Sequence, residues 1–178
     1  MPRLFVALRP PEPVRDALFD TMDAVEGARW QGDDQLHLTL RFIGEVPTPE
    51  AEDLAAELGR ISAAPFVLRI AGVGHFARKG RAHTLWAGVT PSPELTALQA
   101  KVERACQRAG LAPEPRKFAA HVTLARLGGS AGPLGEWLAR HGPLSAPPWP
   151  VDEFQLVQST LGAAGSHYEP AVRYPLVS

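Results

Sequence analysis

The sequence predicts an α+β fold in which a largely antiparallel sheet is covered by helices on its outside. Apolar residues recur at helical spacing in some segments and form short strand-like runs in others. The order helix then strand occurs twice, with extra strands around each copy. No Pro/Gly/Ser-rich linker separates the two halves. We therefore expect residues 1–178 to form a single domain made of two lobes around one central cleft.

The first third of the chain is expected to contain a strand, a helix, a second strand and a second helix. Their predicted bounds are Leu4–Leu8, Pro13–Val25, Leu36–Ile43 and Pro49–Ile61. The helices carry apolar residues every three or four positions, whereas the strands are short apolar runs that end at a proline or a glycine. Thr48 is the expected N-cap of the second helix, because a threonine hydroxyl can accept a hydrogen bond from the first turn.

The rest of the chain alternates between strands and two further helices. Strands are expected at Phe66–Val73, Thr84–Val89, Ala119–Leu127, Phe154–Leu161 and Tyr168–Leu176. A helix begins after its cap Ser92 and ends at Gly110, and a short helix covers Leu134–Arg140. The basic turn Arg78–Arg81 joins the first two of these strands, and the glycine-rich turn Gly162–Ser166 joins the last two.

Composition excludes several classes of protein. Apolar residues make up 45% and charged residues 21% of the chain, as in ordinary globular proteins, and the net charge is −1. A protein that coats long nucleic acid carries a basic excess, so any nucleic-acid substrate is expected to be held locally, at an end or at one nucleotide. Cys106 is the only cysteine, which excludes an intrachain disulfide and a Cys-based zinc site. With no signal peptide and no apolar run of membrane-spanning length, we expect a cytoplasmic protein.

The strongest functional signal is an internal repeat. One copy reads His37-Leu38-Thr39-Leu40 and the other reads His121-Val122-Thr123-Leu124, 84 positions later. Side chains alternate along a strand, so each histidine shares a face with the threonine two residues on, while the intervening residue points into the core. Two copies facing each other across a cleft would bring together two imidazoles and two hydroxyls.

That set of groups suits a phosphate ester. With an unperturbed pKa of about 6.5, one histidine can act as a base while the other acts as an acid near neutral pH. The threonine hydroxyls can donate hydrogen bonds to non-bridging phosphate oxygens. We therefore predict that His37 and His121 are catalytic and that Thr39 and Thr123 bind phosphate.

A further candidate residue follows five positions after each histidine. Arg126 follows His121, and its guanidinium can stabilise charge that builds up on phosphorus. Phe42 follows His37, and its ring can stack on a nucleic-acid base. Both offsets are odd, so an ideal strand would aim these side chains at the opposite face. A bulge or a strand end is needed to bring them round.

At these residues the sequence resembles the 2H phosphoesterase superfamily, and within it the bacterial and archaeal RNA 2′,3′-cyclic phosphodiesterases once called 2′-5′ RNA ligases. The likeness covers nearly the whole chain, from RLFVAL through HLTLRFIGEV, AGVGHF, LWAGV and RKFAAHVTLAR to a tail with Gln158, Ser159, Leu161 and Tyr168. The two His-x-Thr copies are specific as a pair, whereas the other segments are individually weak. The resemblance implies two α+β lobes related by a pseudo-twofold axis, with the histidines in the cleft between them.

The resemblance also implies a reaction and a set of site residues. His37, Thr39, His121, Thr123 and Arg126 match the family's catalytic set, and Phe42 matches a base-stacking position. The implied reaction is hydrolysis of an RNA-terminal 2′,3′-cyclic phosphate to a 2′-phosphate without a metal or cofactor, with weak reverse 2′-5′ ligation. Our hypothesis takes His121 as the base and His37 as the acid, although the symmetry of the repeat leaves that order open.

Three rival interpretations are weaker. A catalytically idle binding module for a nucleotide or RNA end is the main alternative, and the intact His-x-Thr pairs argue against it. A metal hydrolase lacks support, because the motifs contain no carboxylate or second histidine at ligand spacing and Asp33-Asp34 lies in an expected loop. A dinucleotide-binding reading of Gly72-x-Gly74 fails, because no helix is expected after it.

The remaining reactive or charged residues receive structural interpretations. Cys106 is expected to be a buried, inert thiol. The other four histidines are expected to be structural or solvated; they are His75, His83, His141 and His167. The basic turn Arg78–Arg81 and the pair Arg116-Lys117 are interpreted as solvated loop charges in preference to phosphate contacts. We expect a monomer without an obligate protein partner, acting on RNA ends or cyclic nucleotides, with the physiological substrate and the base preference left open.

Overall fold

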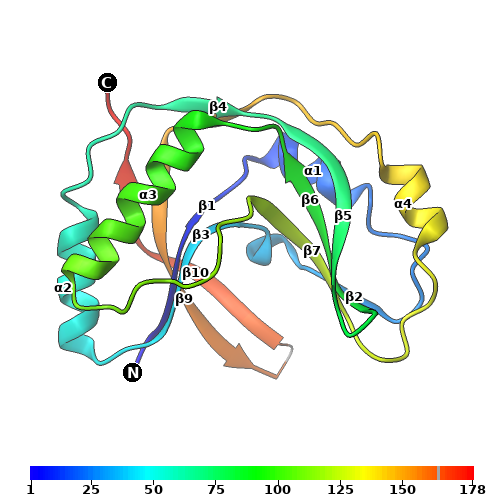
Figure 1. Cartoon of the computed structure of the whole chain (residues 1–178), viewed down its shortest axis with the longest axis horizontal. Coiled ribbons are helices and arrows are strands. Elements are labelled where there is room, and N and C mark those ends of the chain that lie inside the picture. Colours follow the sequence, from blue (N-terminus) through cyan, green and yellow to red (C-terminus); the bar gives the residue numbers. More distant parts are fainter. Residues whose placement is uncertain (164) are drawn as a thin grey trace.

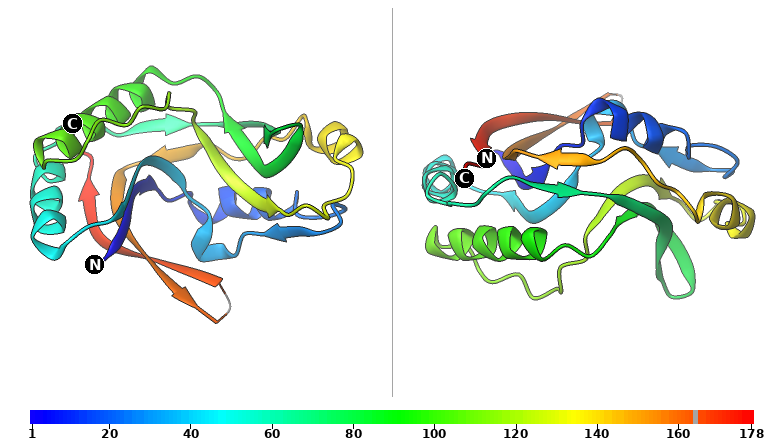
Figure 2. Two further views of the ribbon diagram at one scale, coloured as in Figure 1. Left: turned by 60° about the horizontal axis from the view of Figure 1, so that its bottom comes forward. Right: turned by 90° about the horizontal axis from the view of Figure 1, so that it is seen from above.

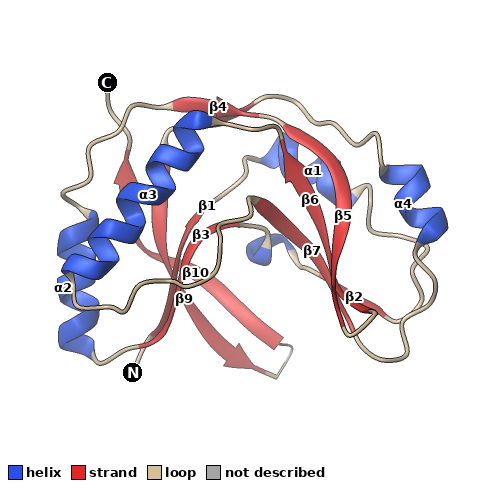
Figure 3. Cartoon of the chain, viewed as in Figure 1, coloured by secondary structure: helices blue, strands red, loops and turns tan. Residues whose placement is uncertain are grey.

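The computed structural model describes residues 1–163 and 165–178, and it confirms the predicted α+β fold. Position 164, within the turn predicted at Gly162–Ser166, lies outside the described residues. Every strand pairing in the described chain is antiparallel (Figure 3). The main sheet runs in the order β10 (Gly165–Pro175), β9 (Glu153–Gly162), β1 (Arg3–Leu8), β3 (Leu38–Glu45), β7 (His121–Leu127), β6 (Arg81–Val89) and β5 (Ile70–Arg78), with β2 (Ala28–Trp30) paired to β7.

Helices lie at both ends of the long axis of the molecule in Figure 1. Helices α2 (Thr48–Leu58) and α3 (Pro93–Arg108) pack side by side at one end, as both views in Figure 2 show. Helix α4 (Gly135–His141) lies at the other end, and α1 (Glu12–Phe19) follows β1. No helix in the described part of the chain has the length and apolar character needed to cross a membrane.

Strand β1 is buried on both faces, which explains why its sequence reads as a continuous apolar run. Leu4, Val6 and Leu8 point into the main core together with the inner faces of the helices. Phe5 and Ala7 point the other way and form a second, smaller cluster with Val157, against which Tyr168 packs. The second face of the sheet is therefore apolar only locally, around β1 and β9.

The first helix is shorter than predicted, because it ends at Phe19 and not at Val25. The Thr21 backbone N–H and hydroxyl both donate to the Leu18 carbonyl, at 3.1 and 2.7 Å. The Thr21 carbonyl accepts in turn from the Trp137 indole N–H at 2.7 Å, so a tertiary contact takes an acceptor that another helical turn would use. Ala24 then adopts a left-handed conformation (φ 58°), which a helix cannot continue.

Other element boundaries also differ from the predicted ones. Ser92 caps α3 as predicted, accepting from the Leu95 N–H at 3.1 Å, whereas Thr48 is the first residue of α2 and not its cap. The predicted strand Phe66–Val73 is two strands, because β4 (Phe66–Leu68) leaves the main sheet to pair with β8 (Trp149–Val151). Strands β2 and β8 were missed, since three residues are too few to reveal an alternating pattern.

An ion pair with little exposure ties the centre of the sheet to α3. The guanidinium of Arg41, which is only 8% exposed, donates from Nε to Glu103 Oε1 at 2.6 Å and from Nη1 to the Phe42 carbonyl at 2.9 Å. Glu103 also accepts from the Gln107 amide at 2.6 Å. The pair fixes the backbone of β3 just beyond Thr39, so it contributes to the position of the first motif.

We predict that Glu103→Ala destabilises the fold because it leaves the Arg41 guanidinium buried without a counter-charge. The free energy of unfolding should fall by about 3 kcal/mol, measured by urea denaturation at pH 7. The matched control is Glu57→Ala, which removes solvent-accessible pairs with Arg108 (2.9 Å) and Arg60 (3.4 Å) and should cost much less than Glu103→Ala. Equal losses in the two variants would contradict the prediction.

Candidate active site

The two motif copies meet at the centre of the main sheet. Leu38 of β3 lies opposite Val122 of β7, and it is the one residue pair in register between these strands in the described chain. Both side chains are fully buried in the main core. Because neighbours along a strand point to opposite faces, the residues that flank this pair share the other face of the sheet. Those flanking residues are His37, Thr39, His121 and Thr123.

A β-bulge lies at the last residue of each motif copy, which is a leucine in both. In β3, Thr39 lies opposite Ala7 and Arg41 opposite Val6, which leaves Leu40 without a partner. In β7, Thr123 lies opposite Trp86 and Ala125 opposite Leu85, which leaves Leu124 without a partner on β6. The burial patterns agree, since each motif leucine and the residue after it are both buried.

The bulges turn the next side chains back to the face of the histidines. One extra residue reverses the alternation of a strand. Phe42 lies opposite Phe5, on the same face as Thr39, and Arg126 lies opposite Thr84, on the same face as Thr123. The odd sequence offset required a bulge to bring Phe42 and Arg126 to the face of the histidines. Both strands have that bulge.

His37 lies in an apolar environment on the β1 side of this face. It is 8% exposed, and its ring centroid is 5.6 Å from that of Phe5 and 5.9 Å from that of Tyr168. Burial lowers the pKa of His37 to about 4, and the positive charge of Arg9 acts in the same direction. Its Nδ1 is buried and has no hydrogen-bond partner among the described residues. The free protein therefore holds His37 neutral at pH 7.

His121 is more accessible and has a fixed orientation. Its Nδ1 is 2.7 Å from the Ala119 carbonyl, and because a carbonyl can only accept, Nδ1 carries the proton. This tautomer leaves the lone pair on Nε2. The Phe76 ring meets His121 edge to face, with centroids 4.9 Å apart. Burial lowers the pKa of His121, while the bond to Ala119 raises it.

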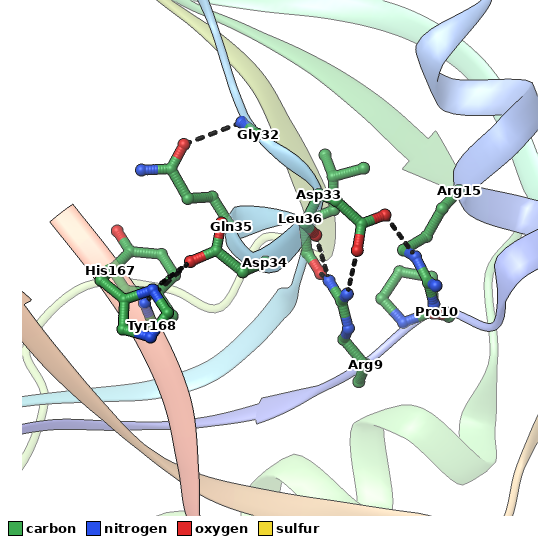
Figure 4. A network of polar contacts seen from close by, with 10 residues as sticks. All are labelled: Arg9, Pro10, Arg15, Gly32, Asp33, Asp34, Gln35, Leu36, His167 and Tyr168. Atoms are coloured by element: carbon green, nitrogen blue, oxygen red, sulfur yellow. Dashed lines mark hydrogen bonds and ion pairs between the residues drawn. The ribbon is translucent and has the colours of Figure 1, made fainter. Parts of the chain in front are cut away.

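The short helical turn before His37 is held from two sides, as Figure 4 shows. Asp33 accepts from Arg9 and from Arg15, each at 2.9 Å. Asp34 lies 3.0 Å from His167 Nδ1 and accepts from the Tyr168 backbone N–H at 3.1 Å. From the sequence, both carboxylates are expected in a loop. In the structure, their contacts hold the backbone that leads into His37.

Gln35 completes this turn by bridging it to β10. Its side-chain oxygen accepts from the Gly32 N–H at 2.8 Å (Figure 4). Its amide donates to the Ser166 carbonyl, also at 2.8 Å. A pocket of about 250 Å³ opens beside His37, lined by polar residues of β9 and β10 that the sequence did not single out, among them Gln155 and Arg173. No motif marks these residues, because only the return of the C-terminal strands to β1 brings them here.

Phe42 and Arg126, the candidate residues five positions after the histidines, have different surroundings. Phe42 is 46% exposed, stacks parallel to Phe5 at 6.3 Å, and has the Arg3 guanidinium over its ring, 6.0 Å from the centroid. Arg126 is exposed and donates from Nη1 to the Thr84 hydroxyl at 3.2 Å. Phe42 thus lies near His37 and Arg126 near His121, in matching positions of the two halves.

The remaining sequence candidates have structural explanations. Cys106 is fully buried, and burial raises the pKa of its thiol to about 11, so it is inert as expected. Gly74 lies within β5 and no helix follows it; a Cβ there would come within 2.4 Å of the Trp86 ring, which explains the glycine by packing. His141 contacts Asp23 at 3.2 Å. Among the described residues no group of three His, Cys, Asp or Glu side chains is placed to hold a metal ion.

Comparisons with known proteins agree with this arrangement. A family model described as the 2'-5' RNA ligase superfamily matches residues 10–163. The chain is 35% identical to the RNA 2',3'-cyclic phosphodiesterase of Aeropyrum pernix, over 77% of this chain and 80% of that protein. The RNA 2',3'-cyclic phosphodiesterase of Thermus thermophilus is 34% identical, over 98% and 90% of the two chains.

The fold is also similar to that of solved structures. The crystal structure of E. coli LigT complexed with 3'-AMP is 27% identical and covers 100% of both chains, with a TM-score of 0.80. The match of the family model covers most of the chain, and curated relatives and solved structures cover nearly all of it. The chain therefore belongs to the 2'-5' RNA ligase superfamily.

Proposed function

We propose that this protein hydrolyses RNA-terminal 2′,3′-cyclic phosphates to 2′-phosphates by acid–base catalysis with His37 and His121. The observation that carries the proposal is the pairing of Leu38 with Val122, since it puts both His-x-Thr copies on one face of one sheet. The activity agrees with the name of the A. pernix relative, RNA 2',3'-cyclic phosphodiesterase. Weak 2′-5′ ligation is the reverse of the same chemistry.

The proposed step is an in-line displacement at phosphorus. A water molecule attacks, the bond from phosphorus to O3′ breaks, and the phosphate stays on O2′. His121 Nε2 takes the proton from the water, and His37 gives a proton to O3′ as it leaves. Thr39 and Thr123 donate hydrogen bonds to the non-bridging oxygens, and Arg126 stabilises the charge on them. Exchange with solvent then returns each histidine to its starting state.

The assignment of base and acid follows from the surroundings of the two rings. The bond from Nδ1 to the Ala119 carbonyl keeps the His121 lone pair on Nε2, as a base requires. His37 must be protonated to act as the acid, yet burial and Arg9 lower its pKa to about 4 in the free protein. The negative charge of a bound phosphate raises that pKa, so the substrate itself brings His37 into its working state.

Phe42 is the proposed platform for the terminal base. The Phe42 ring is 46% exposed and stacks on Phe5, which also contacts His37, and aromatic stacking tolerates all four bases. The site lies where the two proposed lobes of the single domain meet, and both motif copies come from one chain. We accordingly propose a monomer that needs no partner subunit to complete the site, and a cytoplasmic location for a protein with no disulfide.

We predict that His37→Ala and His121→Ala each lower kcat by about 10²- to 10⁴-fold, because each removes one proton transfer. The substrate is an RNA ending in a 2′,3′-cyclic phosphate, incubated with a chelator, and the product is identified by phosphorus NMR. His75→Ala is the matched control, since this exposed histidine lies on β5 next to Phe76, which faces His121. The control should retain full activity.

The outcomes separate the rival functions. Substantial turnover by either alanine variant would remove that histidine from the mechanism. Binding of the RNA end by the wild-type protein without any product would favour a binding module. Loss of wild-type activity on chelation would favour a metal hydrolase.

We predict bell-shaped pH profiles with an acidic optimum for kcat/KM. This parameter reports the free protein, in which burial lowers the pKa of both histidines below the usual value of about 6.5. Activity should fall at low pH as the base becomes protonated and at higher pH as the acid loses its proton, so the optimum lies below about pH 6.5. The optimum of kcat should lie at higher pH, because bound phosphate raises both pKa values. A kcat/KM profile that rises steadily through pH 8 would contradict the assignment.

A further inference from the structure

A second and larger pocket lies away from the histidines, at the tip of the β5–β6 hairpin. Its volume is about 740 Å³, and it opens between the hairpin tip and the loop that follows β7. Its lining includes Arg78, Lys79 and Arg81 from the hairpin and Gly128 and Gly129 from the loop, and contains no carboxylate. None of the residues proposed for catalysis or base stacking lines it.

The cations of this pocket lack counter-charges. In the described part of the chain, Arg78, Lys79 and Arg81 take part in no ion pair. The arginines beside His37 are different, because Arg9 is paired with Asp33 and Arg173 with Glu153. A concave site lined by one sign of charge concentrates the field and attracts an anion. The β5–β6 side of the sheet therefore carries, in one pocket, a cluster of three positive charges that are unpaired within the described chain.

A continuous set of contacts joins this pocket to His121. The Phe76 ring, which meets His121 edge to face, lies 6.5 Å from the ring of His83, a residue of the pocket lining. His83 Nδ1 is 2.8 Å from the Thr84 hydroxyl, the same hydroxyl that accepts from Arg126. A chain molecule bound at His121 can therefore reach the pocket along Arg126 and Phe76.

The pairing of the hairpin places the two arginines of the pocket on the face of Phe76. Phe76 and Arg78 are two residues apart on β5, so they share a face, and Arg78 lies opposite Arg81. Arg29 of β2 lies opposite Arg126 and adds a further positive charge on this face. The basic turn that the sequence favoured as solvated charge is thus continuous with the proposed catalytic face.

We propose that this pocket binds a backbone phosphate of the RNA strand, upstream of the terminal cyclic phosphate. The inference rests on the proposed function and deepens it, since it makes an RNA end a better substrate than a cyclic mononucleotide. Arginine forks match the oxygens of a phosphodiester and do not read the base, so the pocket is indifferent to sequence. The terminal base stacks on Phe42, and the rest of the strand leaves along β6.

The test compares two substrates in the wild-type protein and in the double variant R78Q/R81Q. One substrate is an eight-nucleotide RNA ending in a 2′,3′-cyclic phosphate, and the other is a 2′,3′-cyclic mononucleotide. The double variant should lower kcat/KM on the RNA by about tenfold and leave that on the mononucleotide unchanged. The slope of log kcat/KM against log salt on the RNA should become shallower by about 0.7, which corresponds to one lost phosphate contact on a single strand.

The matched control is R69Q/R104Q, which removes the same charge from two exposed positions outside the pocket. It should leave both substrates unaffected. Equal losses of kcat/KM on the two substrates in R78Q/R81Q would overturn the proposed phosphate site. An equal loss on the RNA in the control would do the same. No loss on the RNA in R78Q/R81Q would overturn it as well.

A binding measurement separates this inference from the proposed function. The ligand is the same RNA carrying a terminal 2′-phosphate, which the protein does not hydrolyse, and binding is followed by fluorescence anisotropy. Weaker binding by R78Q/R81Q but not by the control supports the pocket even if the wild-type protein hydrolyses neither substrate, a result that would overturn only the proposed function. Equal binding by all three proteins would overturn the pocket.

Discussion

The pairing of Leu38 with Val122 is the constraint on which the site depends. These residues lie in the two copies of the motif, and the strands that carry them touch in register only there within the described chain. Because both side chains are buried in the main core, their neighbours must point to the opposite face. The hydrophobic core thereby fixes the direction of four polar side chains that make no contribution to it.

The equivalent bulges at Leu40 and Leu124 extend this constraint to a third residue in each half. A regular strand would have buried Phe42 and Arg126 or sent them to the helical side. The bulge instead places two consecutive residues inward, and the guanidinium of Arg41 is accommodated in the interior by Glu103. The same backbone irregularity therefore serves the core and the site at once.

The two halves are alike in backbone and unlike in electrostatics. His37 lies among Phe5 and Tyr168, and the nearby arginines are neutralised by carboxylates that hold its turn. His121 is more accessible and has a fixed tautomer, and Arg126 on the same face takes part in no ion pair with any described residue. A duplicated motif with unequal surroundings gives two histidines different proton affinities, which acid–base catalysis requires.

The sequence alone determined the α+β class, most of the elements and the six proposed site residues, because strand periodicity and a duplicated His-x-Thr pattern are local properties. It also identified the need for a bulge at Phe42 and Arg126, since that need follows from counting residues. The early end of α1, the split of Phe66–Val73, the contacts of Asp33 and Asp34, and the place of Gln155 in the pocket beside His37 depend on partners far away in the chain. Only the tertiary structure decided them, because a hydrogen bond to Trp137 or a strand returning to β1 leaves no trace in the local pattern.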